Sequence, residues 1–565
     1  MFLPATRDEM AARGWDALDV ILVSGDAYVD SPFGGAAVVG RTLEAAGFRT
    51  GILAQPDWRS LDDIRRLGAP RLFWGVTAGG VDSMVANYTA TGRKRRQDDF
   101  TPGGVNDRRP DRASLAYANL IRRACRPCAP IVLGGIEASL RRIAHYDFWS
   151  DRIRGSLLFD AKADLLVYGM AEQTVVELAR RLAAGRDARG LAGTCHAAPS
   201  PPPDAVVLPD FEAAAADKGA FLEMFRLFAA NQDPATARPL AQRHGTRWLV
   251  HNPPAPPLAG DALDRAHGLP YERELHPRDA AAGPVRALDT IRFAITTHRG
   301  CYGGCGFCAI AAHQGRRVTS RSATSILAEA AAFTRHPRWR GTIADVGGPT
   351  ANMYAIECPR QAAAGACADR ACLHPDVCPR LPVDHRPQTD LLRRLRAVPG
   401  VRHVFVASGL RHDLVLADRA HGAAYLDALA AHHVSGQLKL APEHSEPAVL
   451  RLMRKPGVEK LLAFRTLFQA ASARHGKRQF LTYYFIAAHP GCTDDDMRRL
   501  KQFATRHLRL APEQVQVFTP APSTWATALY WTERDPDTGA PVFVEKSPRR
   551  KQAQKELLTC PARTC

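Results

Sequence analysis

The 565-residue sequence has no stretch that approaches the roughly 18 consecutive apolar residues of a membrane-spanning helix. It also lacks the charged-then-apolar pattern of an export signal, since the first apolar run, DVILVSG, follows mixed acidic and basic residues. Tandem repeats and long low-complexity tracts are absent as well. We therefore expect a soluble, cytoplasmic globular protein with no membrane partner, and its length predicts two or three domains.

Acidic residues are in deficit. The 57 Asp and Glu face 75 Lys and Arg, which gives a formal net charge of +18. Such a surplus can attract nucleic acid or other polyanions. The arginines are nevertheless scattered along the whole length, as the solvated surfaces of any Ala- and Arg-rich chain would have them. The charge leaves nucleic acid open as a partner without arguing for it.

The amino-terminal part alternates short apolar runs with stretches of helical periodicity, such as AVVGRTLEAAGF and RASLAYANLIRRA. This α/β alternation predicts a doubly wound, Rossmann-like domain over residues 1–194. Residues 195–289 contain two Pro-rich stretches and are interpreted as a linker and helical connector. The expected strands of the first domain are Asp19–Val23, Arg49–Leu53, Arg71–Val76, Pro130–Leu133 and Asp164–Val167.

A second alternation predicts a partial (β/α)6 barrel over residues 290–525, with a Cys-rich insertion at 350–386. In barrels of this kind the chemistry lies on the loops that follow the strands, and here those loops are rich in glycine, charge, hydroxyl groups and cysteine. Residues 526–565 are expected to form a polar, basic tail. The expected strands are Ile291–Thr297, Thr342–Val346, His403–Ala407, Gln437–Leu440, Leu481–Ile486 and Gln514–Phe518.

Three cysteines, Cys301, Cys305 and Cys308, lie within eight residues on the loop after the first barrel strand, in RGCYGGCGFCAI. Thiolates at this density hold zinc or an iron–sulfur cluster. Zinc would need a fourth ligand, which His298 or His313 could supply. A cubane cluster on three cysteines keeps one iron free of protein ligands, which catalysis or ligand binding requires. The glycines between the cysteines would let the backbone wrap around such a cluster.

A second group of four cysteines, Cys358, Cys367, Cys372 and Cys378, lies within 21 residues of the insertion. Four thiols would saturate one zinc ion or one further iron–sulfur cluster, and the two remain equally open. The insertion has little apolar content, so a metal could hold it together. Disulfides explain the cysteines poorly, because the total of 13 is odd and no export signal is apparent.

The loop CYGGCGFC resembles the CxxxCxφC signature of the radical S-adenosylmethionine (SAM) superfamily, with Phe307 at the aromatic position. The resemblance implies a [4Fe–4S] cluster on Cys301, Cys305 and Cys308, with its fourth iron bound by the amino and carboxylate groups of SAM. It also implies an enzyme that cleaves SAM to a 5′-deoxyadenosyl radical, with an electron donor such as flavodoxin or ferredoxin. GWDALDVILVSGDAYVD, VLGGIEASLRRIAHYDFWSD and YYFIAAHPG extend the resemblance to YgiQ-type radical SAM proteins, without supplying a substrate.

Further SAM contacts follow from the pattern of that superfamily. It usually has GGE after the second strand, whose backbone meets the SAM amino group. Here the stretch is DVGGPT, in which Gly347 and Gly348 match and Pro349 replaces the acid, so only the backbone role is kept. Position on the strand-end loops nominates four more cofactor contacts: Ser408, Arg411, Lys439 and Glu443.

The amino-terminal domain is similar to the cobalamin-binding domains that precede many radical SAM barrels. Those domains often carry a D-x-H-x-x-G ligand motif, whereas the equivalent turn here is GDAYVDSPFGG and has no histidine. We expect a domain that has kept the fold without cobalamin and helps to shape the substrate channel.

The main prediction is a radical SAM enzyme of unknown substrate. One alternative is an enzyme that modifies tRNA or another nucleic acid, which would use the positive charge and the second cysteine group. No RNA-binding module such as a small β-barrel is apparent at the carboxyl terminus to support it. The other alternative is a non-catalytic iron–sulfur or zinc protein on the same scaffold, which the replaced acid at Pro349 favours.

Overall fold

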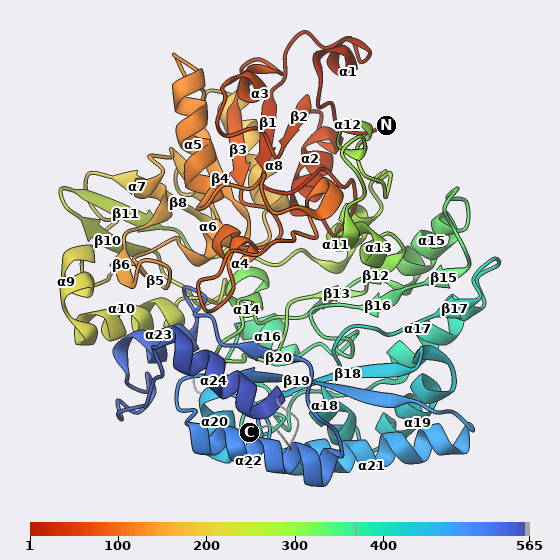
Figure 1. Ribbon diagram of the computed structural model, residues 1–565. Helices are drawn as coiled ribbons and strands as arrows, with labels where there is room; N and C mark the ends of the chain where they lie inside the picture. The colour runs from red at the N-terminus through yellow and green to blue at the C-terminus, as the bar shows by residue number, and fades with distance from the viewer. Residues whose placement is uncertain (368–369, 560–565) are drawn as a thin grey trace. The chain divides into compact units, whose positions relative to one another are not determined.

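The computed structural model describes residues 1–367 and 370–559, and the chain divides into two compact units (Figure 1). The first unit comprises Met1–Leu258 and Arg265–Arg292, and the second comprises Ala259–Asp264 and the chain from Phe293 onward. Within these described ranges, no helix is both long and apolar enough to cross a membrane.

Five parallel strands form the centre of the first unit, in the order β2-β1-β3-β4-β7. All five residues of β1 are buried, as expected for a strand of a parallel sheet with both faces covered. Helix α2 (Gly35–Ala45) contacts α8 (Glu172–Ala183), and α3 (Asp62–Arg65) contacts α5 (Ala113–Ala124). The predicted doubly wound arrangement is confirmed. The strands are β1 (Val20–Ser24), β2 (Thr50–Ala54), β3 (Phe73–Thr77), β4 (Ile131–Gly134) and β7 (Leu165–Val167).

The region expected to be a linker, residues 195–289, instead extends this sheet. β8 (Thr194–Ala198) runs antiparallel to β7, and β11 (Arg247–His251), β10 (Leu240–His244) and β9 (Val206–Val207) follow to the edge. The first Pro-rich stretch lies between β8 and β9, the second follows β11 and leads to α11 (Gly260–His267), and α10 (Lys218–Ala230) lies between β9 and β10. The chain then enters the second unit near residue 293, close to the expected start of the barrel.

Six parallel strand positions follow one another in chain order in the second unit. β12 (Ala294–Thr296) pairs with β16 (Asp345–Gly347), and β15 (Thr342–Ile343) pairs with β17 (His403–Val404). A parallel bridge between Leu410 and Leu440 connects this part to the sheet β18-β19-β20. The predicted strand order of a partial (β/α)6 barrel is confirmed, although Ile291 ends helix α13 (Arg286–Ile291) and does not begin a strand. The last three strands are β18 (Gln437–Glu443), β19 (Phe480–Ala487) and β20 (Val515–Val517).

Helices separate the barrel strands at the predicted places. They are α15 (Ala323–Phe333), α17 (Arg386–Arg396), α19 (Gly422–Ala428), α21 (Val458–Arg474) and α22 (Asp494–Phe503). Helix α17 has the pattern that such a position needs: Leu391, Leu392 and Leu395 are buried, whereas its arginines are largely exposed.

The expected polar tail at residues 526–565 is largely folded. Helix α23 (Trp525–Thr532) is mostly buried, and α24 (Pro548–Thr559) contacts α22, β19 and β20. The Gln554 side chain binds backbone groups of the loop after β19: it accepts from the amide of Ala488 (3.0 Å) and donates to the carbonyl of Cys492 (3.3 Å). The sequence did not indicate a buried helix here, because the buried residues of α24, namely Lys551, Gln554 and Leu558, form no apolar pattern within a basic segment. The last six residues, 560–565, lie outside the described ranges.

Candidate active site

The cysteine loop, residues 300–318, follows β12 and is closed at its base by two short strands. β13 (His298–Arg299) pairs antiparallel with β14 (Thr319–Ser320). The amide of Cys301 donates to the carbonyl of Gly315 at 3.3 Å, which is a second connection across the base. The three cysteines are thereby held after the carboxyl end of the first barrel strand, where such folds place their chemistry.

Two glycines make this loop possible. Gly300 has φ +79°, and a Cβ atom there would lie 1.8 Å from the carbonyl oxygen of Arg317. At Gly303 a Cβ would lie 3.2 Å from Sγ of Cys301 and 3.3 Å from Nη1 of Arg411. Side chains at these positions would displace the loop backbone or crowd the sulfur, so glycine is required by close approach.

The three cysteines are free thiols that lie close enough to perturb one another. Burial and then the neighbouring Cys305 raise the pKa of Cys308, to about 12, and raise the pKa of Cys301. The amide of Gly303 donates to Sγ of Cys301 at 3.3 Å. Metal binding at these thiols would therefore release protons.

Zinc and a cubane cluster are the two candidates for these sulfurs. Across the residues that the structure describes, one group of three His, Cys, Asp or Glu ligand atoms lies within 4.8 Å of one another, and it does not include Cys301, Cys305 or Cys308. Tetrahedral zinc would hold its sulfur ligands about 3.8 Å apart. The spacing without a metal does not decide between the two, whereas the donor set of three thiolates suits a cubane cluster, in which each thiolate binds a different iron.

Arg411 lies beside the cysteine loop, and two of its three guanidinium nitrogens bind a neighbouring carboxylate. It precedes α18 (His412–Ala417) and forms a bidentate pair with Asp413, with Nε–Oδ1 at 2.8 Å and Nη2–Oδ2 at 2.5 Å. The third nitrogen, Nη1, lies 3.8 Å from Sγ of Cys305. The guanidinium holds the pKa of Asp413 well below its usual range, so the buried pair is ionic.

A second buried ion pair lies on another side of the loop. Nζ of Lys455 is 3.6 Å from a carboxylate oxygen of Glu443, and both side chains are buried. Lys455 acts to lower the pKa of Cys301, whereas Glu443 acts to raise that of Cys308. The loop is therefore flanked by charges of both signs, each already paired within the chain.

Of the two glycines predicted to meet SAM, Gly347 ends β16 and Gly348 follows it. The carbonyl of Gly347 accepts from the amide of Thr297 at 2.7 Å, so this oxygen already has a partner in the sheet. A Cβ atom at Gly348 would lie 2.7 Å from the His298 ring, which explains why this position lacks a side chain. Both glycines are thus close to the strand that leads into the cysteine loop.

The remaining predicted cofactor contacts are placed differently from one another. The amide and hydroxyl of Ser408 both donate to the carboxylate of Asp345. Lys439 is exposed within β18, on the face opposite the buried Leu438 and Leu440, so it does not lie on the loop after the strand. Glu443 is the last residue of β18 and does reach the cysteines.

Phe307 connects the cysteine loop to two other strand-end loops. Its ring packs edge-on against His489, with ring centroids 6.2 Å apart. His489 in turn packs against Phe518, at 5.0 Å, just after β20. Sequence reasoning missed His489, as well as Asp345, Asp413 and Lys455. The pairing of Asp413 could have been inferred from its spacing two residues after Arg411, but nothing in the sequence marks Lys455.

The second cysteine group gathers around the same loop. Cys358, Cys372 and Cys378 pack into one apolar cluster with Tyr302 and Cys301. The amide of Cys358 donates to the Tyr302 hydroxyl at 3.1 Å. Burial raises the pKa of Cys372 to about 11, and the three other cysteines of the group contribute to this rise. The insertion lacks a strand of its own, and residues 368 and 369 lie outside the described ranges.

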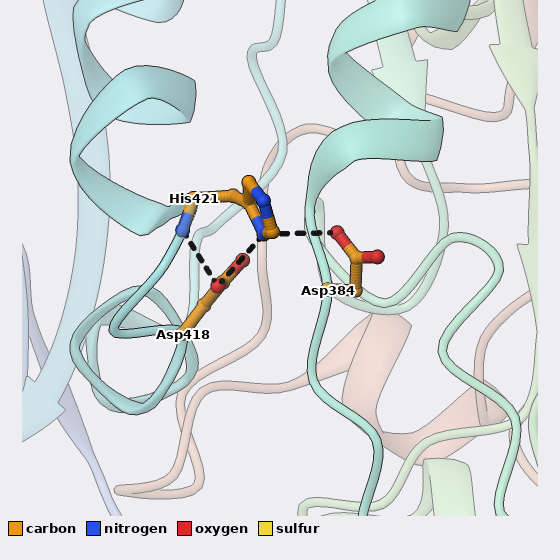
Figure 2. Close-up of side chains that lie close together, drawn as sticks. All are labelled: Asp384, Asp418 and His421. Atoms are coloured by element: carbon orange, nitrogen blue, oxygen red, sulfur yellow. Dashed lines mark hydrogen bonds and ion pairs between the residues drawn. The ribbon is translucent and has the colours of Figure 1, made fainter.

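Among residues 1–367 and 370–559, the one close group of three ligand-type side chains is Asp384, Asp418 and His421 (Figure 2). Asp418 is buried and accepts from the amide and Nδ1 of His385, at 2.8 and 2.9 Å, and from the amide of His421 at 2.9 Å. Asp384 accepts from the exposed Arg386. These carboxylates serve the chain's own donors and connect the beginnings of α17 and α19.

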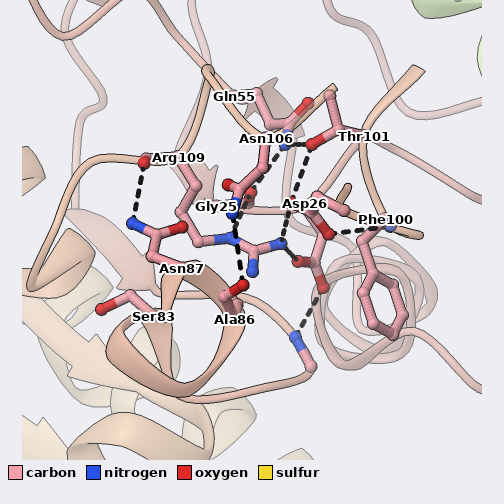
Figure 3. A network of polar contacts seen from close by, with 12 residues as sticks. Gly25, Asp26, Gln55, Ser83, Ala86, Asn87, Phe100, Thr101, Asn106 and Arg109 are labelled. Atoms are coloured by element: carbon pink, nitrogen blue, oxygen red, sulfur yellow. Dashed lines mark hydrogen bonds and ion pairs between the residues drawn. The ribbon is translucent and has the colours of Figure 1, made fainter. Parts of the chain in front are cut away.

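In the first unit, Arg109 fills the edge where the strand order reverses between β1 and β3 (Figure 3). Its Nε donates to the carbonyl of Gly25 at 3.1 Å, and Nη2 binds Asp26 and Asp98. A Cβ atom at Gly25 would lie 2.1 Å from the carbonyl oxygen of Ala78, so the strand ends approach closely here. Burial outweighs Arg109 and raises the pKa of Asp26 to about 6. This is the edge at which doubly wound folds bind ligands.

Comparison with known proteins covers both units. The family model described as Radical SAM N-terminal matches residues 2–294, and the model described as Radical SAM superfamily matches residues 295–504. A UPF0313 protein of Fusobacterium nucleatum is 49% identical over 99% of this chain and 98% of its own length. A UPF0313 protein of Thermotoga maritima is 48% identical over 98% of each.

Solved structures with a similar fold are much more distant in sequence. The radical SAM methyltransferase TsrM from Kitasatospora setae, with cobalamin and a [4Fe–4S] cluster bound, is 17% identical, with a TM-score of 0.49 over 90% of this chain and 76% of that one. The cobalamin-dependent SAM radical enzyme OxsB, with aqua-cobalamin bound, is 13% identical, with a TM-score of 0.47 over 93% of this chain and 57% of that one.

Proposed function

The chain belongs to the radical SAM superfamily, as a relative of the UPF0313 proteins, and we propose that Cys301, Cys305 and Cys308 hold its [4Fe–4S] cluster. The protein is a SAM-cleaving radical enzyme of unspecified substrate. The bound cluster supplies the electron that cleaves SAM to methionine and a 5′-deoxyadenosyl radical, which takes a hydrogen atom from the substrate. The observation that carries the ligand assignment is the closed loop that gathers three thiols after the first barrel strand, where burial and then Cys305 and Cys301 raise the pKa of Cys308.

The residues around the loop would have different tasks. Phe307, Gly347 and Gly348 are proposed to face SAM. Phe307 lies in the cysteine loop and offers its ring, whereas the two glycines lie close to the strand that leads into this loop and offer backbone groups. Ser408, Arg411 and Glu443 are bound to Asp345, Asp413 and Lys455, and these contacts support a role in fixing the walls of that pocket. The proposed cofactor contact of Lys439 has no such support, because its side chain is exposed in mid-strand.

The test is anaerobic reconstitution followed by addition of dithionite and SAM. We expect about four irons on the cysteine loop and formation of 5′-deoxyadenosine. The matched control replaces Cys301, Cys305 and Cys308 with alanine. If the wild type binds a cluster and yields no more 5′-deoxyadenosine than this control, the enzymatic function is refuted and the non-catalytic alternative is favoured.

We also propose a second metal on Cys358, Cys367, Cys372 and Cys378. The common packing of three of these cysteines beside Tyr302 supports it, as does the contribution of Cys358, Cys367 and Cys378 to the raised pKa of Cys372. Metal analysis distinguishes the two candidates, because about eight irons per chain indicate a second cluster, whereas four irons with one zinc indicate a zinc site. No metal beyond the first four irons would refute the proposal.

Cobalamin does not fit the edge of the first unit where the resemblance would place it. The turn after β1 offers Asp26 in place of an imidazole, and Arg109 occupies the strand ends with its own partners. TsrM and OxsB both have cobalamin bound, so these two structures do not support the expectation that this chain lacks it. We nevertheless propose that this edge binds no cobalamin. Retention of hydroxocobalamin through gel filtration, with loss of retention in Gly25→Val, would overturn the proposal.

Partners follow from the chemistry. A one-electron donor such as flavodoxin or ferredoxin is proposed to reduce the cluster, and the eleven described cysteines are all free thiols, which supports a reducing, cytoplasmic setting. Nucleic acid as substrate rests on the +18 charge and on the second cysteine group. A complex with tRNA that weakens steeply with salt would favour this alternative.

A further inference from the structure

Arg411 has one nitrogen left over after its ion pair, and that nitrogen lies at a cysteine sulfur. Asp413 takes Nε and Nη2 in a planar, bidentate contact. This contact fixes the plane of the guanidinium, so the direction of Nη1 is also fixed. Nη1 lies 3.8 Å from Sγ of Cys305, at the long end of an N–H···S hydrogen bond.

The backbone of Arg411 is held as firmly as its side chain. Its amide donates to Oδ1 of Asn352 at 2.9 Å, and Nδ2 of Asn352 donates back to the Arg411 carbonyl at 3.0 Å. Asn352 is buried and follows the GGPT loop after β16. Asn352 therefore fixes the backbone of Arg411, while Asp413 fixes its guanidinium. A side chain that moves to cover a substrate would not need both restraints.

Gly303 completes the arrangement from the loop side. A Cβ atom there would lie 3.3 Å from Nη1 of Arg411 and 3.5 Å from Sγ of Cys305. The absence of a side chain at this position lets the guanidinium approach the sulfur directly. The Arg411 side chain is 8% exposed, so water does not screen the contact.

We infer that Arg411 is a positioning residue that donates an N–H···S hydrogen bond to Cys305 and raises the reduction potential of the cluster. This inference rests on the proposed assignment of the three cluster cysteines. Hydrogen bonds to ligand sulfurs and nearby positive charge favour the reduced cluster, which carries one more negative charge. Asp413 opposes the charge of Arg411, so the two residues should shift the potential in opposite directions.

The pair Lys455–Glu443 gives an internal comparison. It is also buried and also lies near the cysteines, but its ammonium is paired at 3.6 Å and the described contacts include no hydrogen bond from it to a sulfur. If general charge near the loop sets the potential, substitution of Lys455 should act like substitution of Arg411. If the directed N–H···S bond matters, Arg411 should have the larger effect.

The experiment is an EPR-monitored redox titration of the reconstituted full-length protein without SAM. The variants are Arg411→Gln, Arg411→Lys, Asp413→Asn and Lys455→Met. The matched control is Arg393→Gln, which breaks an exposed Arg–Asp pair on α17. We expect Arg411→Gln to keep about four irons per chain and to lower the midpoint potential, Arg411→Lys to fall between it and the wild type, and Asp413→Asn to raise the potential.

Two outcomes would overturn the inference. One is an unchanged midpoint potential in Arg411→Gln with full iron content, and the other, should that variant not fold, is unchanged potentials in both Arg411→Lys and Asp413→Asn. Failure of the proposed function would look different, because the wild type itself would then bind no redox-active cluster.

Discussion

Substitution of Gly300 by alanine should abolish the cluster site while leaving most of the fold intact. The residue has φ +79°, which costs an alanine about 1–2 kcal/mol. The larger effect is the clash, because the new Cβ would lie 1.8 Å from the Arg317 carbonyl oxygen, against about 3.4 Å in ordinary contact. The neighbour is backbone at the foot of β14, so it cannot rotate away.

Relief of this clash requires the base of the loop to open. That sacrifices the β13–β14 pairing and the bond from the Cys301 amide to Gly315, each hydrogen bond being worth about 1 kcal/mol net. A total of about 3 kcal/mol corresponds to a roughly 100-fold loss in the population of the closed loop. Iron and sulfide content after anaerobic reconstitution should fall accordingly, together with 5′-deoxyadenosine.

Two alanine substitutions serve as controls. Gly304 lies in the same loop with φ +58° and Gly476 lies far along the chain with φ +62°, and no heavy atom comes within 4 Å of the Cβ position except the Tyr302 carbonyl, at 4.0 Å from Gly304. Both should keep wild-type iron, because they carry the dihedral strain without the clash. Wild-type iron content in Gly300→Ala would show that the base of the loop does not hold the cysteines.

Three further predictions concern other parts of the molecule. Gln554→Ala leaves the Ala488 amide and the Cys492 carbonyl without their buried partner, and it should lower the free energy of unfolding in urea by about 2–4 kcal/mol. Gln552→Ala on the same helix should lower it by less than about 0.5 kcal/mol. Equal effects of the two substitutions would contradict the role given to α24. Burial raises the pKa of Asp26 to about 6, so the folded state keeps a proton that the unfolded state releases near pH 4, and stability falls as the pH rises through this window. The difference in unfolding free energy between wild type and Asp26→Asn should therefore change by about 2 kcal/mol between pH 4 and 7. A constant difference would refute this prediction. Replacement of Cys358 and Cys372 by alanine should remove the second metal, which metal analysis would show as a loss of iron or zinc, while the EPR signal of the first cluster persists. Loss of the second metal and of this EPR signal together would mean that the two cysteine groups form one site.

The sequence predicted the elements whose signal is periodic and local. The strand order of the barrel followed from apolar runs such as Leu481–Ile486, which alternate with helical stretches, whereas the cluster site inferred from the cysteine spacing stays a prediction. β10 and β11 escaped prediction because LAQRH and RWLVH are short, charged at one end and surrounded by proline. They become strands through pairing with each other and with β8, which is a tertiary effect.

Side-chain partners were the harder part of the prediction. Arg411 was expected to meet SAM because it lies after a strand, yet its contacts depend on Asp413, Asn352 and the cysteine loop, which the chain brings together from three segments. Glu443 was assigned to the loop after the strand because β18 was expected to end at Leu440, whereas the strand continues through an irregular register to Glu443. A strand that ends three residues later moves every assignment made from its end.

The closed base of the cysteine loop has a thermodynamic consequence. Gathering three thiols from a flexible loop costs conformational entropy, which rises slowly with loop length. In this chain the β13–β14 pair and the Cys301–Gly315 bond already restrict residues 300–318, so much of that entropy is lost when the barrel folds. Metal binding then costs less conformational entropy, so more of its free energy appears as affinity for the metal. The chain should accordingly fold before the cluster is inserted and accept it as a preorganised host.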